Sequence, residues 1–153
     1  MLATYEFFGG VCATVGRELS LNETVDTRSI RRELRARYGE RSTVDRAVSR
    51  VVRTLRAIGA LTGELGSATS TAADRIPVPM SHGQWLAHAV MLSRRRREMD
   101  AREIAAAPEL FMFRLPPLAN DYPLIERFRE GVDRDVLVER ARSSPDQQQL
   151  AIP

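Results

Sequence analysis

Three stretches at the start of the chain space their apolar residues three or four positions apart, as along one face of an α-helix. The first extends over Thr4–Leu19. The second follows a cap at Asp26 or Thr27 and stops at Gly39, a residue type that readily takes the left-handed conformation found after helices. The sequence therefore predicts two helices before residue 40.

The third stretch has the most regular pattern. Ser42 and Asp45 resemble a capping box at its start, and Gly59 marks its end. Its apolar stripe consists of Val44, Val48, Val51, Leu55 and Ile58. On the opposite side, at about 100° per residue, lie Arg46, Arg50 and Arg53. We expect one face of this helix to be buried and the other to present arginine.

A β-hairpin is predicted after the third helix. Two short strand-like runs, Ala60–Leu65 and Arg75–Met80, flank the segment Gly66–Asp74, which is rich in Gly, Ser, Thr and Ala. Pro77 and Pro79 confine the second run to a sheet edge, because proline has no backbone N–H to donate. The hairpin is expected to have a loose tip.

The rest of the chain predicts interrupted helices. The expected elements are helices over about 81–98 and 100–107, an apolar extended strap over 109–120, and two short helices over about 121–130 and 133–141. Ser81 with Gln84 caps the first of them, and the composition of residues 143–153 is typical of a disordered tail. We therefore expect an N-terminal domain at 1–80, a helical dimerisation or partner-docking region at 81–142, and a tail.

Composition narrows the class of protein. With 153 residues, 43% hydrophobic and 28% charged, the chain is typical of a globular protein rather than of a disordered chain or a coiled-coil rod. No apolar run reaches the roughly 20 residues that a membrane span needs, and Glu6 stands where a signal peptide carries positive charge. Cys12 is the single cysteine, so there is no internal disulfide. We expect a cytoplasmic protein with no membrane partner.

Positive charge is concentrated in one segment. Residues 27–59 contain ten arginines and three acidic residues, a local charge of +7 in a chain whose net charge is +3. All 23 basic residues are arginine, which mostly suggests a GC-rich coding sequence, although guanidinium also suits phosphate and guanine. A solvated helix face is the plain alternative for these arginines. The coincidence with the most regular helix favours DNA binding.

Three helices followed by a hairpin, with an arginine-faced third helix, are the element order of a winged helix-turn-helix. The stretch Val51-Val52-Arg53-Thr54-Leu55-Arg56-Ala57-Ile58-Gly59-Ala60-Leu61 resembles the end of a recognition helix entering the first strand of a wing. The resemblance is to the broad superfamily of winged-helix DNA-binding domains and covers residues 4–80. It implies a mainly α fold with a small β-hairpin wing, followed by a helical C-terminal part.

The same resemblance implies how the domain would bind DNA. The third helix would enter the major groove, with its N-terminal half toward the base edges, and the second helix would lie along the backbone. Thr43, Arg46, Ser49 and Arg50 would then face bases, with Arg53 a turn further along and better placed for phosphate. Arg31, Arg32 and Arg35 would flank the backbone, and Arg75 would follow the wing.

The C-terminal half offers an interaction surface rather than a catalytic site. Its predicted interface residues, too many for one small core to cover, are Trp85, Leu86, Val90, Met91, Leu92, Phe111 and Phe113. Either this helix is central to the C-terminal half or it crosses an interface. His88 shares a face with Trp85 and is read as a packed histidine, and Arg94–Arg97 as a helix-terminal charge cluster.

No sequence motif of a catalytic, metal or cofactor site is present. We therefore expect a non-enzymatic double-stranded DNA-binding protein, a transcriptional regulator in the commonest case, acting as a homodimer or with a protein partner. The alternative is a small accessory subunit of a multi-protein system that acts on DNA, such as phage defence or DNA modification.

Overall fold

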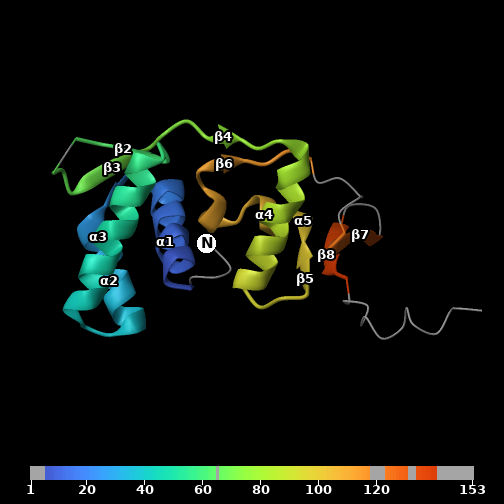
Figure 1. Ribbon diagram of the computed structural model, residues 1–153, viewed down its shortest axis with the longest axis horizontal. Helices are drawn as coiled ribbons and strands as arrows, with labels where there is room; N and C mark the ends of the chain where they lie inside the picture. The colour runs from blue at the N-terminus through green and yellow to red at the C-terminus, as the bar shows by residue number, and fades with distance from the viewer. Residues whose placement is uncertain (1–5, 65, 118–122, 131–133, 141–153) are drawn as a thin grey trace, which may run out of the picture.

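The computed structural model describes residues 6–64, 66–117, 123–130 and 134–140. They form two groups of elements that lie side by side (Figure 1). Helices α1, α2 and α3 with a small sheet make the first group, and α4, α5 and a second sheet make the other. Within the described residues the fold is mixed α/β with three small sheets, so it agrees only loosely with the expected mainly α class with a small β-hairpin wing. The predicted disordered tail lies outside the described residues.

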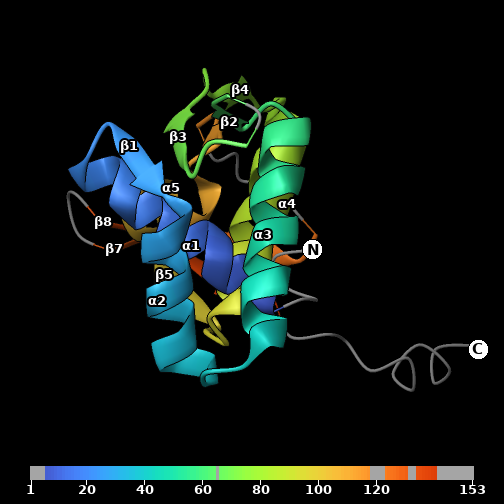
Figure 2. The same ribbon diagram turned by 90° about the vertical axis from the view of Figure 1, so that its left-hand side faces the viewer.

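The first group contains the three helices that the sequence predicts. They are α1 (Glu6–Leu21), α2 (Thr27–Tyr38) and α3 (Ser42–Ala57). Asp26 caps α2 by accepting a hydrogen bond from the backbone N–H of Arg28 at 2.8 Å, and Gly39, with φ 88°, follows its end. Figure 2 shows α2 and α3 side by side, joined by a short turn.

The start of α3 differs from the predicted capping box. Arg41 is the cap residue and makes no side-chain capping bond, while Ser42 is already helical. The carboxylate of Asp45 is bound by Arg35 of α2 instead. The Arg35 side chain is long enough to reach this carboxylate from the neighbouring helix. The local sequence around Ser42 does not predict such a contact between helices.

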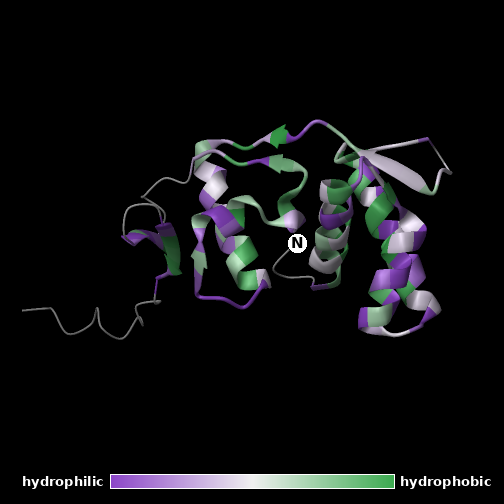
Figure 3. Cartoon of the chain, turned by 180° about the vertical axis from the view of Figure 1, so that it is seen from behind, coloured by the Kyte–Doolittle hydropathy of each residue, from purple (hydrophilic) through white to green (hydrophobic). Residues whose placement is uncertain are grey.

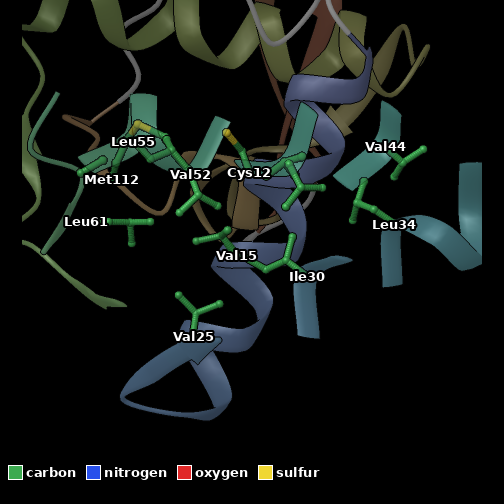
Figure 4. Close-up of a cluster of buried hydrophobic side chains, with 13 residues drawn as sticks. Cys12, Val15, Val25, Ile30, Leu34, Val44, Val52, Leu55, Leu61 and Met112 are labelled. Atoms are coloured by element: carbon green, nitrogen blue, oxygen red, sulfur yellow. The ribbon is translucent and has the colours of Figure 1, made fainter. Parts of the chain in front are cut away.

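The core of the first group lies between α1, α2 and α3 (Figure 4). It includes Val11, Cys12, Val15, Val25, Ile30, Leu34, Val44, Val48, Val52, Leu55, Leu61 and Met112. Val52 takes the buried place predicted for Val51, which is half-buried. Ile58, the predicted end of the stripe, is 51% exposed because α3 ends at Ala57. Figure 3 shows hydrophilic and hydrophobic residues alternating along α2 and α3, as in amphipathic helices.

A three-stranded antiparallel sheet closes the first group. Its strand order is β1 (Thr24–Asp26), β3 (Thr69–Ala72), β2 (Leu61–Thr62), so β3 is central. The second arm of the hairpin is therefore β3 and not the predicted run Arg75–Met80. The threonines of β3 suit a strand, and the turn from β2 to β3 is shorter than expected.

The prolines place the predicted second arm elsewhere. The two-residue strand β4 (Ile76–Pro77) pairs in parallel with β6 (Phe113–Arg114), and this pair links the two groups. Ile76 donates its N–H to the carbonyl of Met112 at 2.9 Å, while Pro77 has none to donate. The strap around Phe113 is thereby fixed, as the sequence predicts, against the body of the protein.

The second group is only partly helical. Helix α4 (Met80–Ser93) is followed by β5 (Glu98–Asp100), α5 (Ala101–Ala105), the 3₁₀ turn η1 (Pro108–Leu110) and β6. The two helices predicted near the end are instead the hairpin strands β7 (Ile125–Glu130) and β8 (Arg134–Glu139), which pair with β5 in the order β5-β8-β7.

Side chains from α4 form most of the second core. Leu86, Val90 and Met91 are buried there with Met99, Ile104, Ile125 and Leu137, so these three are not interface residues. Phe111 and Phe113 are half-buried against the cores of their own chain. Of the predicted interface set, Trp85 and Leu92 remain 54% and 45% exposed.

The two groups touch where η1 packs on α1. A Cβ atom placed on Gly16 of α1 would lie 2.0 Å from the carbonyl oxygen of Pro108. Glu109 is buried, and Arg94 at the end of α4 binds its carboxylate through Nε at 2.8 Å and Nη2 at 3.0 Å. The predicted arginine cluster thus begins with a residue that anchors the strap.

Candidate nucleic-acid interface

Helix α3 presents arginines on the side opposite its buried valines. Val44, Val48, Val52 and Leu55 are buried against α1 and α2. The exposed side carries Thr43, Arg46, Arg50 and Arg53. Because the buried side is fixed by packing, the direction in which these polar side chains leave the protein is fixed as well.

The outward arginines differ from the other arginines of α2 and α3 in the contacts that they make. Among the described residues, no hydrogen bond or ion pair engages the guanidinium of Arg46, Arg50 or Arg53. A shallow hollow of about 440 Å³ is lined by Thr43, Arg46, Ala47, Arg50 and Val51. Guanidinium groups can pair with guanine O6 and N7, and apolar side chains can contact the thymine methyl group. The hollow is lined by side chains of both kinds.

Among the predicted arginines, Arg35 has a structural role. Its Nε donates to Asp45 Oδ1 at 2.8 Å and its Nη2 donates to Asp45 Oδ2, a two-point bond that ties α2 to α3. Hydrogen bonding to Arg35 holds the pKa of the Asp45 carboxyl below its usual range. The structure thus removes Arg35 from the DNA-facing set and makes it a clamp between the two helices.

Arg31 and Ser49 are also joined to each other. Nη2 of Arg31 donates to Ser49 Oγ at 2.8 Å, and Ser49 Oγ donates to the carbonyl of Asp45 at 2.7 Å. Ser49 is therefore held in the helix pair and is not available as a free base-reading hydroxyl. The Nε of Arg31 is buried and has no hydrogen-bond partner in the structure.

A basic groove lies beside α3, between the start of α2 and the β2–β3 turn. Its volume is about 740 Å³. It is lined by Thr27, Arg28, Arg31, Ser49, Val52, Arg53, Arg56, Ala57, Gly63, Gly66, Ser67 and Ala68. Four of these residues are arginines and none is acidic. Such a groove favours an anion with several oxygen atoms, such as a phosphodiester backbone.

Arg56 shapes one wall of this groove by holding the turn. Its Nη2 donates to the carbonyls of Ser67 and Thr69 at 2.9 and 3.1 Å and to Ser70 Oγ at 2.8 Å. Its Nε also reaches Ser70 Oγ at 3.1 Å. The hairpin is thereby fixed relative to α3.

The remaining residues of the predicted site divide by position. Arg32 is exposed on α2, and Arg75 lies between β3 and β4, off the β2–β3 hairpin. Neither residue lines the groove. Sequence reasoning missed Arg28 and Arg56. Arg28 is three residues before Arg31 on α2, so helical spacing predicts that both lie on the same face. The contact of Arg56 with the turn depends on tertiary structure.

Other groups that could carry chemistry are built into the two cores. Burial, with a smaller effect of the Glu109 charge, raises the pKa of the Cys12 thiol to about 12. His88 is buried, as predicted, with Nε2 3.5 Å from Glu139 Oε1. Within the described ranges, no group of three or more His, Cys, Asp and Glu side chains could hold a metal ion.

No protein-family model, curated protein sequence or solved structure matches this chain. In the part of the chain that the structure describes, every helix is too short or too polar to cross a membrane.

Proposed function

We propose that this chain is a non-enzymatic double-stranded DNA-binding protein that acts as a transcriptional regulator, with α3 in the major groove. In this proposal the first group of elements is a winged helix-turn-helix. The order helix, strand, two helices and two strands, with β3 between β1 and β2, supports it. Helices α2 and α3 would be the helix-turn-helix, and the β2–β3 hairpin the wing.

The observation that carries the proposal is the continuous arginine surface formed by α3 and the groove. Arg46, Arg50 and Arg53 leave α3 on its exposed side without partners among the described residues, and the adjoining groove has four arginines and no acid. A face that merely keeps a protein soluble gains from mixed charge, whereas phosphate binding requires an excess of one sign.

The geometry suggests a division of work between the two parts of this surface. Arg46 and Arg50 lie beside the hollow on the N-terminal half of α3, where side chains of a recognition helix meet base edges. Arg28 and Arg31 line the groove, where guanidinium groups would contact a backbone phosphate. Arg32 would add a phosphate contact outside it.

The experiment is to select duplexes from a random pool with the intact protein and then to compare variants by fluorescence anisotropy. Arg46→Ala or Arg50→Ala is expected to reduce the preference for the selected duplex over a scrambled one by about 5- to 150-fold, from about 1–3 kcal/mol per lost bidentate contact. Arg32→Ala is expected to weaken binding to both duplexes alike.

Arg129→Ala is the matched control. Arg129 is an exposed arginine on β7, and its 3.8 Å approach to Asp135 is loose. The control removes the same charge from the second group and is expected to leave both affinities nearly unchanged. Equal effects of Arg50→Ala and Arg129→Ala would show that α3 is not the DNA-reading element.

A further inference from the structure

A hollow of about 490 Å³ lies where the two groups of elements meet. One wall is the face of α1 that carries Glu6, Gly9, Gly10, Ala13 and Arg17. At about 100° per residue these positions fall within about 100° of one another, opposite the buried Val11 and Val15. The other walls are the end of α4, the turn η1 and Arg37 near the end of α2. This space, called the junction hollow below, is thus bounded by residues of both groups.

Small residues keep the junction hollow open. Gly9, Gly10 and Ala13 place almost no side-chain atoms on the wall that α1 forms. Glycine within a helix is destabilising relative to alanine, so two adjacent glycines give no benefit to α1 itself. The volume of the hollow is within the range of about 300–1,000 Å³ that is typical of small-molecule sites. The hollow is therefore large enough for a small ligand.

The wall opposite α1 is fixed by its own contacts. Arg94 binds both carboxylate oxygens of Glu109, and its Nη1 donates to Glu103 Oε1 at 2.9 Å. The turn that carries Glu109 also packs closely against Gly16. The wall is preformed, which lowers the cost of binding a ligand, and the Glu109 charge on it is already neutralised.

Arg95 stands on this wall in a conformation that does not suit it. Its φ is 55°, and no other residue in the described ranges, glycines apart, has a positive φ. It follows α4 in a Schellman motif, in which Arg96 donates its N–H to the carbonyl of Met91 at 3.0 Å and Arg95 donates to Leu92 at 3.1 Å. Glycine is the usual residue at this position. Strained residues of this kind cluster at ligand sites.

The charges of the junction hollow leave room for an anion. Arg17 is paired with Glu33, whereas Arg37 Nη2 is 3.8 Å from Glu6 Oε1, too far for a hydrogen bond. No hydrogen bond or ion pair engages the guanidinium of Arg95 among the described residues. One guanidinium without a counter-charge and one that is loosely held therefore line the hollow, one from each group of elements.

We propose that the junction hollow binds a small hydroxylated oxyanion, a phosphorylated sugar or a hydroxy acid. Arg95 and Arg37 bind the phosphate or carboxylate group, for which the planar guanidinium offers paired donors. The proposal goes beyond the proposed function, because no residue lines both this hollow and the basic groove or the hollow on α3.

The rest of the lining favours hydroxyl groups on the ligand. Glu6 offers a carboxylate that accepts hydrogen bonds. Ser93 Oγ donates to the carbonyl of Val90 at 2.8 Å, so its lone pairs are left to accept a bond from the ligand. Leu92 and Pro108 are the only large apolar side chains of the lining, too few for the body of a fatty or aromatic acid.

Isothermal titration calorimetry of the intact protein at constant ionic strength tests the proposal, with ribose 5-phosphate and citrate as probes. At least one of them is expected to bind with a dissociation constant below about 1 mM. It should bind at least about tenfold more tightly than inorganic phosphate, which lacks the hydroxylated body. Binding of ribose 5-phosphate alone identifies a phosphate ester as the ligand, and binding of citrate alone identifies a carboxylate.

Arg95→Gly separates ligand binding from folding. The affinity for the probe should fall at least about tenfold, because a charge-assisted contact is lost. The melting temperature of the protein without probe should rise by about 1–4 °C, because glycine takes the left-handed conformation without strain. Arg97→Ala is the matched control. It removes the same charge two residues further on, at an exposed position outside the lining, and should leave the affinity unchanged.

Ala13→Leu tests the position of the ligand. The larger side chain should fill part of the junction hollow and weaken binding of the organic probe at least about tenfold. Inorganic phosphate, which needs only the guanidinium groups, should bind nearly as before. Equal loss of both probes would contradict a site in which the ligand body lies against α1.

Three further results would overturn the proposal. One is that neither organic probe binds at about 10 mM. Another is that Arg97→Ala weakens binding as much as Arg95→Gly, which would indicate a general effect of positive charge. The third is a loss of DNA affinity in Arg95→Gly as large as that in Arg32→Ala, which would assign Arg95 to the DNA backbone. Failure to bind either probe leaves the proposed DNA binding untouched.

Discussion

The contact between the two groups of elements depends on the absence of a side chain at Gly16. A Cβ there would lie 2.0 Å from the carbonyl oxygen of Pro108, and real Cβ contacts essentially never fall below 3.0 Å. The obstacle is backbone, and the neighbouring Glu109 is held by two hydrogen bonds from Arg94, so η1 cannot move aside without further loss. Gly16→Ala should therefore strain the junction.

The expected change in the free energy of unfolding for Gly16→Ala is the difference between two opposing effects. Overpacking in a closely packed contact costs about 1–3 kcal/mol. Alanine in place of glycine within a helix returns about 0.5–1 kcal/mol. The net destabilisation is then at most about 2.5 kcal/mol, and we expect it near that upper limit because the Cβ would meet backbone, which corresponds to a melting temperature lower by up to about 10 °C for a chain of this length.

Gly10→Ala in the same helix is the control, and we expect it to change the stability in the opposite direction. Its Cβ would meet side-chain atoms and no backbone: the Tyr38 hydroxyl at 3.2 Å, which can shift by a few tenths of an ångström, and Arg37 Nη1 at 3.9 Å. The helix gain should then dominate, and stability should stay equal or rise by up to about 1 kcal/mol. Urea unfolding of both variants measures this. A Gly16→Ala protein as stable as Gly10→Ala would refute the packing of η1 on α1.

Three further predictions concern the first group. The pKa of Asp45 is lowered in the folded state by hydrogen bonding to Arg35, so this pair stabilises the protein above the unfolded pKa of about 3.9. That stability is lost as pH falls through the folded pKa, and Asp45→Asn should flatten the acid side of a plot of stability against pH. Leu55→Ala should cost about 2–5 kcal/mol by lost burial and cavity formation, whereas Arg53→Ala should be nearly neutral in the same denaturant titration. The Cys12 thiol, with its pKa raised to about 12, should react with a disulfide reagent only as fast as the protein opens, so rapid labelling of the folded protein would contradict its buried position.

The first three helices could be predicted from the sequence because long periodic stretches carry strong local signals. Asp26 and Gly39 bound α2 as expected, since capping is decided by neighbouring residues. The second arm of the hairpin could not be placed in this way. Its pairing depends on β1, a strand of three residues about 45 positions earlier in the chain.

The last hairpin shows how one charge pattern can fit two structures. Glu130 and Arg134 are four residues apart, which in a helix would place them on one face. In the structure they stand directly opposite on β7 and β8, with Arg134 Nη1 2.7 Å from Glu130 Oε2. The spacing was equally compatible with both, and the pairing of β8 with β5 decides for the sheet.

The sequence predicts which arginines of the candidate site are exposed, but not which of them bind other residues of the same chain. The outward direction of Arg46 and Arg50 follows from helical periodicity alone. Arg35 binds Asp45, and Arg56 binds Ser70 of the hairpin. Both contacts depend on how close α2, α3 and β3 come in the folded chain. Sequence alone cannot distinguish an arginine that binds a partner from one that binds its own protein.

Binding of a labelled duplex at a series of salt concentrations tests the central claim most directly. If the surface of α3 and the groove binds the DNA backbone, the logarithm of the association constant falls linearly with the logarithm of salt concentration, by about 0.9 for each neutralised phosphate. Removing the phosphate contact of Arg32 by Arg32→Ala should reduce that slope by about one. An absence of binding at 50 mM salt, or an affinity that salt does not change, would contradict the account.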